Sequence, residues 1–204
     1  MSKMKLFYHP ASPFARKCVV VAKEVGADQD LEILNDLVVP FKVNEGIQAV
    51  SPLGKIPTLV GPEGEGIYDS RVICTYLANA YNKWEVFGTD HATHLQSEQQ
   101  QALCDGICDA AVAYRYETAV RPEGMRWGDF SDRQVARIKA SLEVLEKDCG
   151  SYSSERIGGI MAVIALDYLD FRVPELNWRS ECPNLVKWYE DNANRPSLQA
   201  TKPE

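Results

Sequence analysis

The chain has 204 residues, of which 45% are hydrophobic, and this length suits one large domain or two small domains with a buried core. Its formal charge of -7 and its pI of about 5.1 oppose binding to nucleic acids and to anionic membrane surfaces, so we expect neither as a partner. The first residues lack the apolar core of a secretory signal, and no run of about 18 uncharged apolar residues occurs, so we expect a cytoplasmic protein.

The six cysteines form neither a CxxC pair nor a cluster with histidine. Zinc sites and redox dithiols need such clusters. We therefore expect no metal and mostly reduced, structural thiols. Cys18 lies well inside a predicted helix and is expected to be buried.

The first part of the chain alternates strand and helix patterns. Residues 4–8 predict a strand, and Ser12 followed by Pro13 is typical of a helix N-cap and first turn, with Gly26 ending that helix. Residues 31–34 suit a second short strand.

The next segment is less regular. Residues 42–50 predict a weak helix or an irregular loop, and two short strands, 58–60 and 66–68, flank the glycine-rich turn "GPEGEG". Asp69 and Ser70 then cap a helix that carries an apolar stripe.

After Asn82 the strand patterns disappear and helical patterns follow. They cover residues 91–120, 131–149, 159–171 and 183–194. The fold class predicted is therefore α/β plus all-α, with domains at 1–81 and 90–204 and the join near residues 82–90.

One stretch, "SPLGKIPTLV", places a proline where a strand begins. A trans Pro57 can open a strand, whereas a cis Ile56–Pro57 bond would turn the Ile56 backbone outward to pair with a ligand. Only about 5–6% of X-Pro bonds in folded proteins are cis, so the local sequence favours trans.

Five motifs in order give the chain a resemblance to the cytosolic glutathione transferase family over essentially its whole length. They are "HPASPFARK", "SPLGKIPTLV", "YDSRVICTYL", "RPEGMRW" and the long segment that begins "LDYLDFRVPELNW". The match is to bacterial-type members with a serine-type active site. It implies a thioredoxin-like N-terminal domain, an all-helical C-terminal domain, and glutathione as cosubstrate without a further cofactor.

The resemblance also assigns roles in glutathione binding. It implies a cis Ile56–Pro57 bond, with the Ile56 backbone pairing with the cysteinyl part of glutathione. From the residues alone, Asp69 and Ser70 suggest simple capping of a helix. The family, however, binds the γ-glutamyl group of glutathione at this position. The resemblance therefore implies that Ser70 binds the γ-glutamyl carboxylate and that Asp69 faces the γ-glutamyl ammonium. Lys42 and Lys55 are candidate cations for the glycyl carboxylate, although exposed lysines usually only solvate a loop.

Two hydroxyl groups compete for the stabilisation of the glutathione thiolate. Ser12 stands at a helix N-terminus, where the dipole favours an anion, and "HPAS" matches the serine-type classes. Its alternative role is to cap that helix, and the two roles would compete for the geometry of the hydroxyl. Tyr8 is the rival, because other classes use a tyrosine at the end of the first strand.

In the second domain, "DGICD" resembles a segment that lends an aspartate to the glutathione of a neighbouring subunit, which implies a role for Asp105 and a homodimer. A solvated helix acid is the alternative. Tyr114, Tyr116 and Trp127 are candidates to line a pocket for a small hydrophobic electrophile, although aromatic residues at helical spacing are more often core.

One departure from the family concerns folding. Family members usually begin the central helix of the second domain with Ser or Thr, and with Asp three residues later, but this chain has residues 156–159 as Arg-Ile-Gly-Gly. Losing a good N-cap costs about 0.5–2 kcal/mol. We expect a less stable helical domain or a compensating cap from elsewhere.

The resemblance predicts a glutathione transferase that conjugates the thiolate of glutathione to an electrophilic carbon. A non-catalytic glutathione-binding or scaffold protein, and a glutathione-dependent isomerase or peroxidase, are the alternatives, because a fold does not settle a function.

Overall fold

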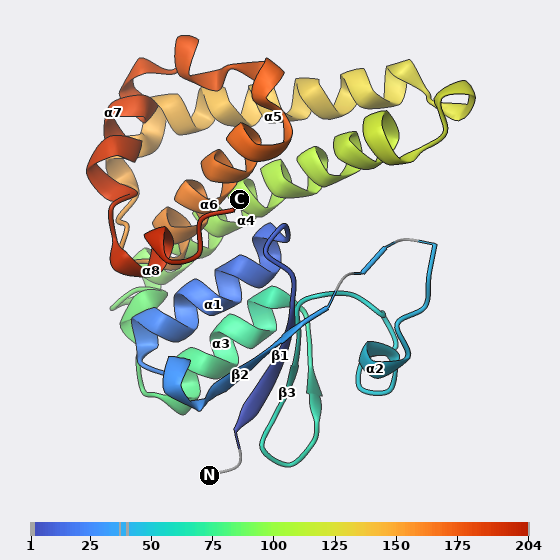
Figure 1. Cartoon of the computed structure of the whole chain (residues 1–204). Coiled ribbons are helices and arrows are strands. Elements are labelled where there is room, and N and C mark those ends of the chain that lie inside the picture. Colours follow the sequence, from blue (N-terminus) through green and yellow to red (C-terminus); the bar gives the residue numbers. More distant parts are fainter. Residues whose placement is uncertain (1–2, 37, 40, 204) are drawn as a thin grey trace. The chain divides into compact units, whose positions relative to one another are not determined.

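The computed structural model describes residues 3–36, 38–39 and 41–203 (Figure 1). The chain divides into two compact units, one spanning Met1–Val86 with Ala200–Lys202 and the other spanning Phe87–Gln199. The first unit is mixed α/β and the second is helical, as the sequence predicts. Within the described ranges, no helix has the length and apolar character needed to cross a membrane.

The first unit is built on a four-stranded thioredoxin-like sheet with strand order β2-β1-β3-β4. β1 (Met4–Tyr8) is parallel to β2 (Leu31–Asn35) and antiparallel to β3 (Thr58–Val60), which is antiparallel to β4 (Gly66–Ile67). Side chains alternate between the two faces of a strand. In β1 this places Met4 and Leu6 in the core and leaves Lys5 exposed.

The helices of the first unit begin and end at local signals. α1 (Pro13–Val25) and α3 (Ser70–Ala80) lie side by side on one face of the sheet, and the short α2 (Glu45–Gln48) lies on the other side (Figure 1). α1 starts directly after Ser12 and ends at Gly26, whose φ of 79° is left-handed. Glycine adopts this conformation without a Cβ penalty, so the predicted stop is confirmed.

The Ile56–Pro57 peptide bond is cis. This confirms the implication of the family resemblance, and the preference for trans drawn from the local sequence is wrong. The trans form of an X-Pro bond is favoured by only about 0.5–1 kcal/mol, so the surrounding structure, and not the dipeptide, determines the isomer.

The second unit contains five α-helices in the described part of the chain. They are α4 (His91–Arg115), α5 (Gly128–Asp148), α6 (Ile157–Arg172), α7 (Pro183–Asn192) and α8 (Pro196–Gln199). α6 forms the centre of this unit, because residues 157–169 are all buried.

The predicted helix over 91–120 ends as an α-helix at Arg115 and continues as a π-helical turn, Tyr116–Val120. Short 3-10 turns are found at Asp28–Asp30, Trp84–Val86, Glu123–Met125, Cys149–Ser151, Pro174–Leu176 and Trp178–Ser180.

The start of α6 receives its cap from another helix. Arg156 makes no side-chain cap, but the Ser97 hydroxyl of α4 accepts a hydrogen bond from the Gly158 backbone N–H at 3.3 Å. A Cβ on Gly158 would lie 2.6 Å from the Gln100 Cβ, so only glycine allows α4 this close. The compensating cap that the sequence left open is therefore Ser97.

The start of α7 is capped in the same manner. Cys182 provides no side-chain cap, whereas the Glu146 carboxylate of α5 accepts the backbone N–H groups of Asn184 at 3.1 Å and Leu185 at 2.8 Å. A carboxylate is favoured at a helix N-terminus by both the free N–H groups and the dipole. Side chains of α4 and α5 thus fix where α6 and α7 begin.

We predict that Ser97→Ala lowers the free energy of unfolding by about 1–3 kcal/mol, because it leaves the buried Gly158 N–H without an acceptor. Denaturant unfolding followed by circular dichroism measures this. Ser141→Ala is the matched control, since Ser141 bonds only within its own helix, to the Arg137 carbonyl. Equal effects of the two substitutions would contradict a capping role for Ser97.

Candidate functional site

The sheet topology brings the predicted residues of the first unit to one edge. β3 is antiparallel to β1 and β4, so β1 and β4 end where β3 begins, and β2, parallel to β1, ends at the same edge. The segments at or next to these strand ends contain Tyr8, Ser12, Lys55, Ile56, Pro57, Asp69 and Ser70, whereas Lys42 lies in the loop between β2 and α2. This edge of the sheet therefore contains the N-terminus of α1, the turn with the cis Ile56–Pro57 bond before β3, and the N-terminus of α3.

Ser12 caps α1 and keeps a hydrogen to donate. Its Oγ accepts the Ala15 backbone N–H at 3.2 Å, and its own N–H donates to the His9 carbonyl at 2.9 Å. A hydroxyl has two acceptor lone pairs and one donor hydrogen, and capping uses one lone pair only. Capping therefore holds Oγ in place without using its hydrogen, and the expected competition between capping and donation to a thiolate stays a prediction.

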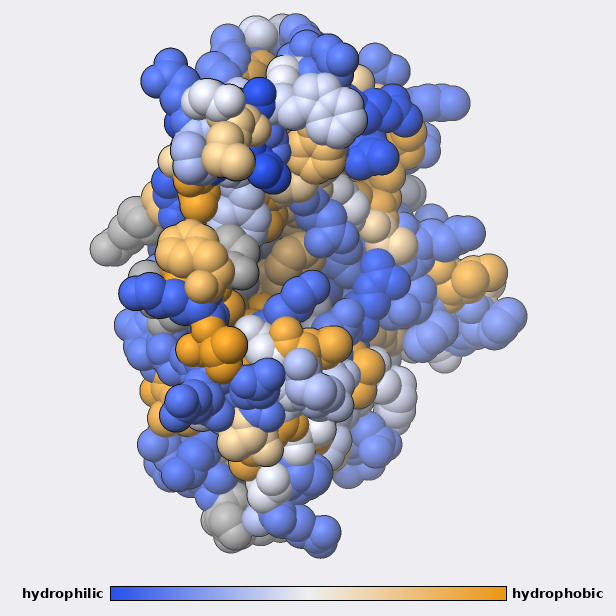
Figure 2. Space-filling view, turned by 90° about the vertical axis from the view of Figure 1, so that its right-hand side faces the viewer, coloured by the Kyte–Doolittle hydropathy of each residue, from blue (hydrophilic) through white to orange (hydrophobic). Residues whose placement is uncertain are grey.

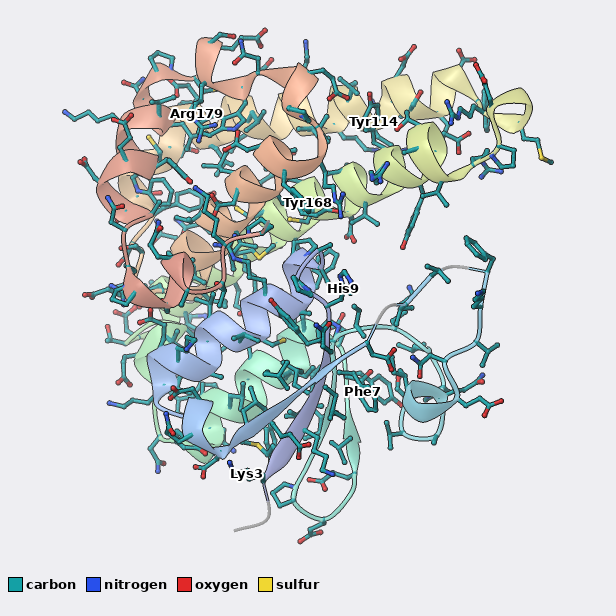
Figure 3. All side chains as sticks on the ribbon, in the orientation of Figure 1. Lys3, Phe7, His9, Tyr114, Tyr168 and Arg179 are labelled. Atoms are coloured by element: carbon teal, nitrogen blue, oxygen red, sulfur yellow. The ribbon has the colours of Figure 1, made fainter. Side chains whose placement is uncertain are left out.

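His9 organises the turn that presents Ser12, and no role for it follows from the sequence alone. Figure 3 labels Phe7 on the sheet and His9 in the loop beyond it. The Ala11 backbone N–H donates to His9 Nδ1 at 3.1 Å, so the imidazole ring holds the backbone of this turn. The signal in the sequence is the position of His9 before Pro10, at the first place of a tight turn that leads into the cap.

Tyr8 ends β1 and is half-buried. Burial raises the pKa of the Tyr8 phenol, and the positive charge of Arg16 lowers it in part. The phenol is therefore protonated at neutral pH and can donate a hydrogen bond. Tyr8 thus stays a chemical rival of Ser12.

Asp69 and Ser70 form the start of α3. The Asp69 carboxylate is exposed and accepts the Arg71 backbone N–H at 3.0 Å, which makes it the N-cap. Ser70 is buried, and its carbonyl accepts the Cys18 thiol at 3.8 Å. Cys18 is fully buried, as predicted. The free N–H groups of this helix start are suited to an anion.

The segment around Pro57 and the loop before α2 contain backbone groups and lysine side chains that a ligand could contact. Ile56 is half-buried and Pro57 is buried, while Lys42 and Lys55 are exposed. The Thr58 hydroxyl donates to the Lys55 carbonyl at 2.8 Å and so fixes the turn before β3.

The remaining predicted residues belong to the second unit. Asp105 on α4 is only 5% exposed, so it is not a solvated surface acid. The Tyr114 hydroxyl donates to Glu175 Oε1 at 2.7 Å, and this bond, with burial, raises the pKa of Tyr114 to about 12. Tyr116 and Trp127 are 40% and 63% exposed, so neither is a core residue.

Each unit has large apolar side chains that are exposed, and Figure 2 shows hydrophobic residues at the surface. Phe41 and Val43 are each 70% exposed, and Met125 is 69% exposed.

Comparisons with known proteins identify the family of the chain. Residues 11–80 match the family model described as glutathione S-transferase, N-terminal domain. The "Uncharacterized GST-like protein YibF" of Escherichia coli K12 is 33% identical over 204 residues, which cover 98% of each chain. The chain belongs to the glutathione S-transferase family.

Solved structures extend the likeness to the whole fold. A glutathione transferase family member from Pseudomonas fluorescens Pf-5 with bound glutathione is 36% identical, with a TM-score of 0.93 and coverage of 99% of this chain and 100% of that one. A second structure of such a member from this organism holds S-(propanoic acid)-glutathione, with 36% identity, the same coverage and a TM-score of 0.89. A glutathione S-transferase from Methylobacillus flagellatus KT with glutathione bound is 34% identical, with a TM-score of 0.87 and again the same coverage.

We predict that Asp69→Ala lowers the free energy of unfolding by about 0.5–2 kcal/mol because it removes the N-cap of α3. Asp69→Asn retains an oxygen that accepts the Arg71 N–H, so its stability should stay within about 0.5 kcal/mol of the wild type. Urea unfolding of the three proteins measures both values. If Asn destabilises as much as Ala, the side chain has a structural role other than capping.

Proposed function

We propose that this protein is a glutathione transferase of the serine type. The hydroxyl of Ser12 donates a hydrogen bond to the sulfur of bound glutathione, and the thiolate attacks an electrophilic carbon of a hydrophobic second substrate. The attack forms the carbon–sulfur bond directly, so the reaction needs no covalent intermediate with the enzyme. The chain's contribution is to hold the two substrates together and to stabilise the thiolate.

The geometry of Ser12 carries this proposal. Its Oγ is held by the Ala15 N–H at 3.2 Å, and its hydrogen donates to no other described group. Lowering the pKa of a thiol by two units from about 8.5 takes roughly 2.7 kcal/mol of preferential thiolate stabilisation. A hydrogen bond to a charged group contributes about 1.5–3 kcal/mol, and the N-terminus of α1 adds a favourable dipole.

The same proposal assigns the other groups at this edge of the sheet. The backbone of Ile56, turned by the cis bond to Pro57, pairs with the cysteinyl residue of glutathione. Ser70 and the start of α3 hold the γ-glutamyl carboxylate, and Asp69 faces the ammonium. Lys42 and Lys55 attract the glycyl carboxylate.

Two relatives support the choice of glutathione as cosubstrate, since both were solved with it bound. The structure with S-(propanoic acid)-glutathione supports a site that also accepts glutathione substituted at sulfur. We further propose a cytoplasmic homodimer in which Asp105 serves the γ-glutamyl ammonium of the glutathione bound to the neighbouring subunit.

The test is steady-state conjugation of glutathione to chlorodinitrobenzene, with Ser12 replaced in two ways. Ser12→Gly removes the hydroxyl but keeps a tolerable N-cap, so it separates catalysis from folding. We expect kcat/KM of Ser12→Gly to fall about 10- to 100-fold, because one charge-assisted hydrogen bond to the thiolate is lost. Ser12→Thr keeps both the cap and the donor and should retain most of the activity.

Tyr8→Phe is the matched comparison and should change kcat/KM less than about threefold. If Tyr8→Phe causes the large loss and Ser12→Gly does not, the serine-type assignment is wrong. If the wild type binds glutathione but conjugates no electrophile, the carrier or scaffold alternative replaces the transferase. Turnover of a substrate without net consumption of glutathione would instead indicate an isomerase.

A further inference from the structure

The connection from β1 to α1 contains few groups that can fix its shape. Residues 8–12 are half-buried or exposed, and the next buried residue is Pro13. Apolar burial therefore contributes little to holding this segment in one conformation. Its hydrogen bonds have to determine where the Ser12 hydroxyl lies.

Both backbone N–H groups that follow His9 in this connection are bound by His9 itself. Pro10 and Pro13 have no N–H, so only the N–H groups of Ala11 and Ser12 remain. The Ala11 N–H donates to His9 Nδ1 at 3.1 Å, and the Ser12 N–H donates to the His9 carbonyl oxygen at 2.9 Å. A single residue thus accepts both hydrogen bonds of the turn.

The two ends of the turn are fixed by the elements that it joins. At the end of β1 the Tyr8 carbonyl oxygen accepts the Asp36 N–H at 2.8 Å. At the start of α1 the Ser12 carbonyl oxygen accepts the Arg16 N–H at 2.9 Å. The turn between these two points therefore sets the position of Ser12 relative to the sheet.

A histidine is an unusual residue at the first place of such a turn. Asp, Asn and Ser are common there, because their side-chain oxygen accepts the N–H of the residue two places later. The ring of His9 makes this same contact through Nδ1, and Pro10 has the second place, which proline favours. The bond that the ring makes is thus one that an asparagine side chain can also make.

We propose that His9 is a positioning residue of the glutathione site and acts on the thiolate through Ser12. Its ring nitrogen and its carbonyl oxygen hold the turn in the conformation from which the Ser12 hydroxyl donates to the sulfur. In this role the imidazole needs no contact with glutathione. The inference rests on the proposed transferase function, because it names a residue on which the Ser12 hydroxyl depends.

The first test measures the pKa of the bound glutathione thiol by ultraviolet titration, together with kcat/KM for conjugation to chlorodinitrobenzene. His9→Ala removes the acceptor of the Ala11 N–H, so the thiol pKa should rise by about 0.5–1 unit and kcat/KM should fall about 3- to 10-fold. His9→Asn retains an acceptor for this N–H and should stay close to the wild type in both values. His91→Ala is the matched control, because His91 is exposed on α4, and it should change neither value.

A double substitution separates positioning from a direct effect of the imidazole. In Ser12→Gly the hydroxyl is absent, so a residue that acts only through this hydroxyl has nothing left to position. Adding His9→Ala to Ser12→Gly should therefore change the thiol pKa by less than about 0.3 unit. An equal rise in both backgrounds shows that the imidazole acts on the thiolate independently of Ser12 and overturns the proposal.

Binding of S-methylglutathione separates positioning from a general loss of the site. This ligand has no ionisable thiol, so the Kd of His9→Ala for it should lie within about twofold of the wild-type value. A loss of affinity as large as the loss of kcat/KM assigns His9 to the folding of the whole site and overturns the proposal.

The remaining outcomes also decide. If His9→Asn is as impaired as His9→Ala, or if His9→Ala keeps the wild-type thiol pKa while Ser12→Gly loses it, the proposal is overturned and the transferase function stands. If the wild type binds glutathione with an unshifted thiol pKa, or if the shift depends on Tyr8 and not on Ser12, the serine-type function fails and the role of His9 fails with it.

Discussion

The constraint on which this structure depends is that the first backbone N–H groups of a helix need acceptors. Ser12 and Asp69 supply them for α1 and α3 from the residue directly before each helix. α6 and α7 lack such a residue, and Ser97 and Glu146 supply the acceptors from neighbouring helices. The caps of α1 and α3 are thus local, whereas those of α6 and α7 also join neighbouring helices of the second unit.

This difference connects the fold to the proposed chemistry. A helix start that is capped by a small hydroxyl has a fixed oxygen, a donor hydrogen and a favourable dipole, which are the requirements for holding a thiolate. Ser12 meets them because its cap uses a lone pair and not the hydrogen. In the helical unit the Ser97 hydroxyl joins α4 to the start of α6. One physical requirement thus both holds the Ser12 hydroxyl in place and joins two helices of the second unit.

The parts of the fold that the sequence predicts are those with local causes. The start of α1 at Ser12, its end at Gly26 and the cap at Asp69 depend on residues adjacent in the chain. The caps from Ser97 and Glu146 could not be predicted, because each donor and acceptor pair is far apart in sequence. The cis bond at Pro57 was indicated only by the family resemblance. The hydrogen bond to His9 is local as well, since it comes from the backbone two residues later, but the residue type alone does not indicate it.

The most direct test of the account is an ultraviolet titration of the thiolate of glutathione bound to the protein. In the wild type and in Ser12→Thr the pKa of the bound thiol should lie about two units below its free value near 8.5, and in Ser12→Gly it should return close to that value. A depressed pKa that survives in Ser12→Gly, or one that is lost in Tyr8→Phe instead, would contradict the claim that the capping hydroxyl of Ser12 stabilises the thiolate.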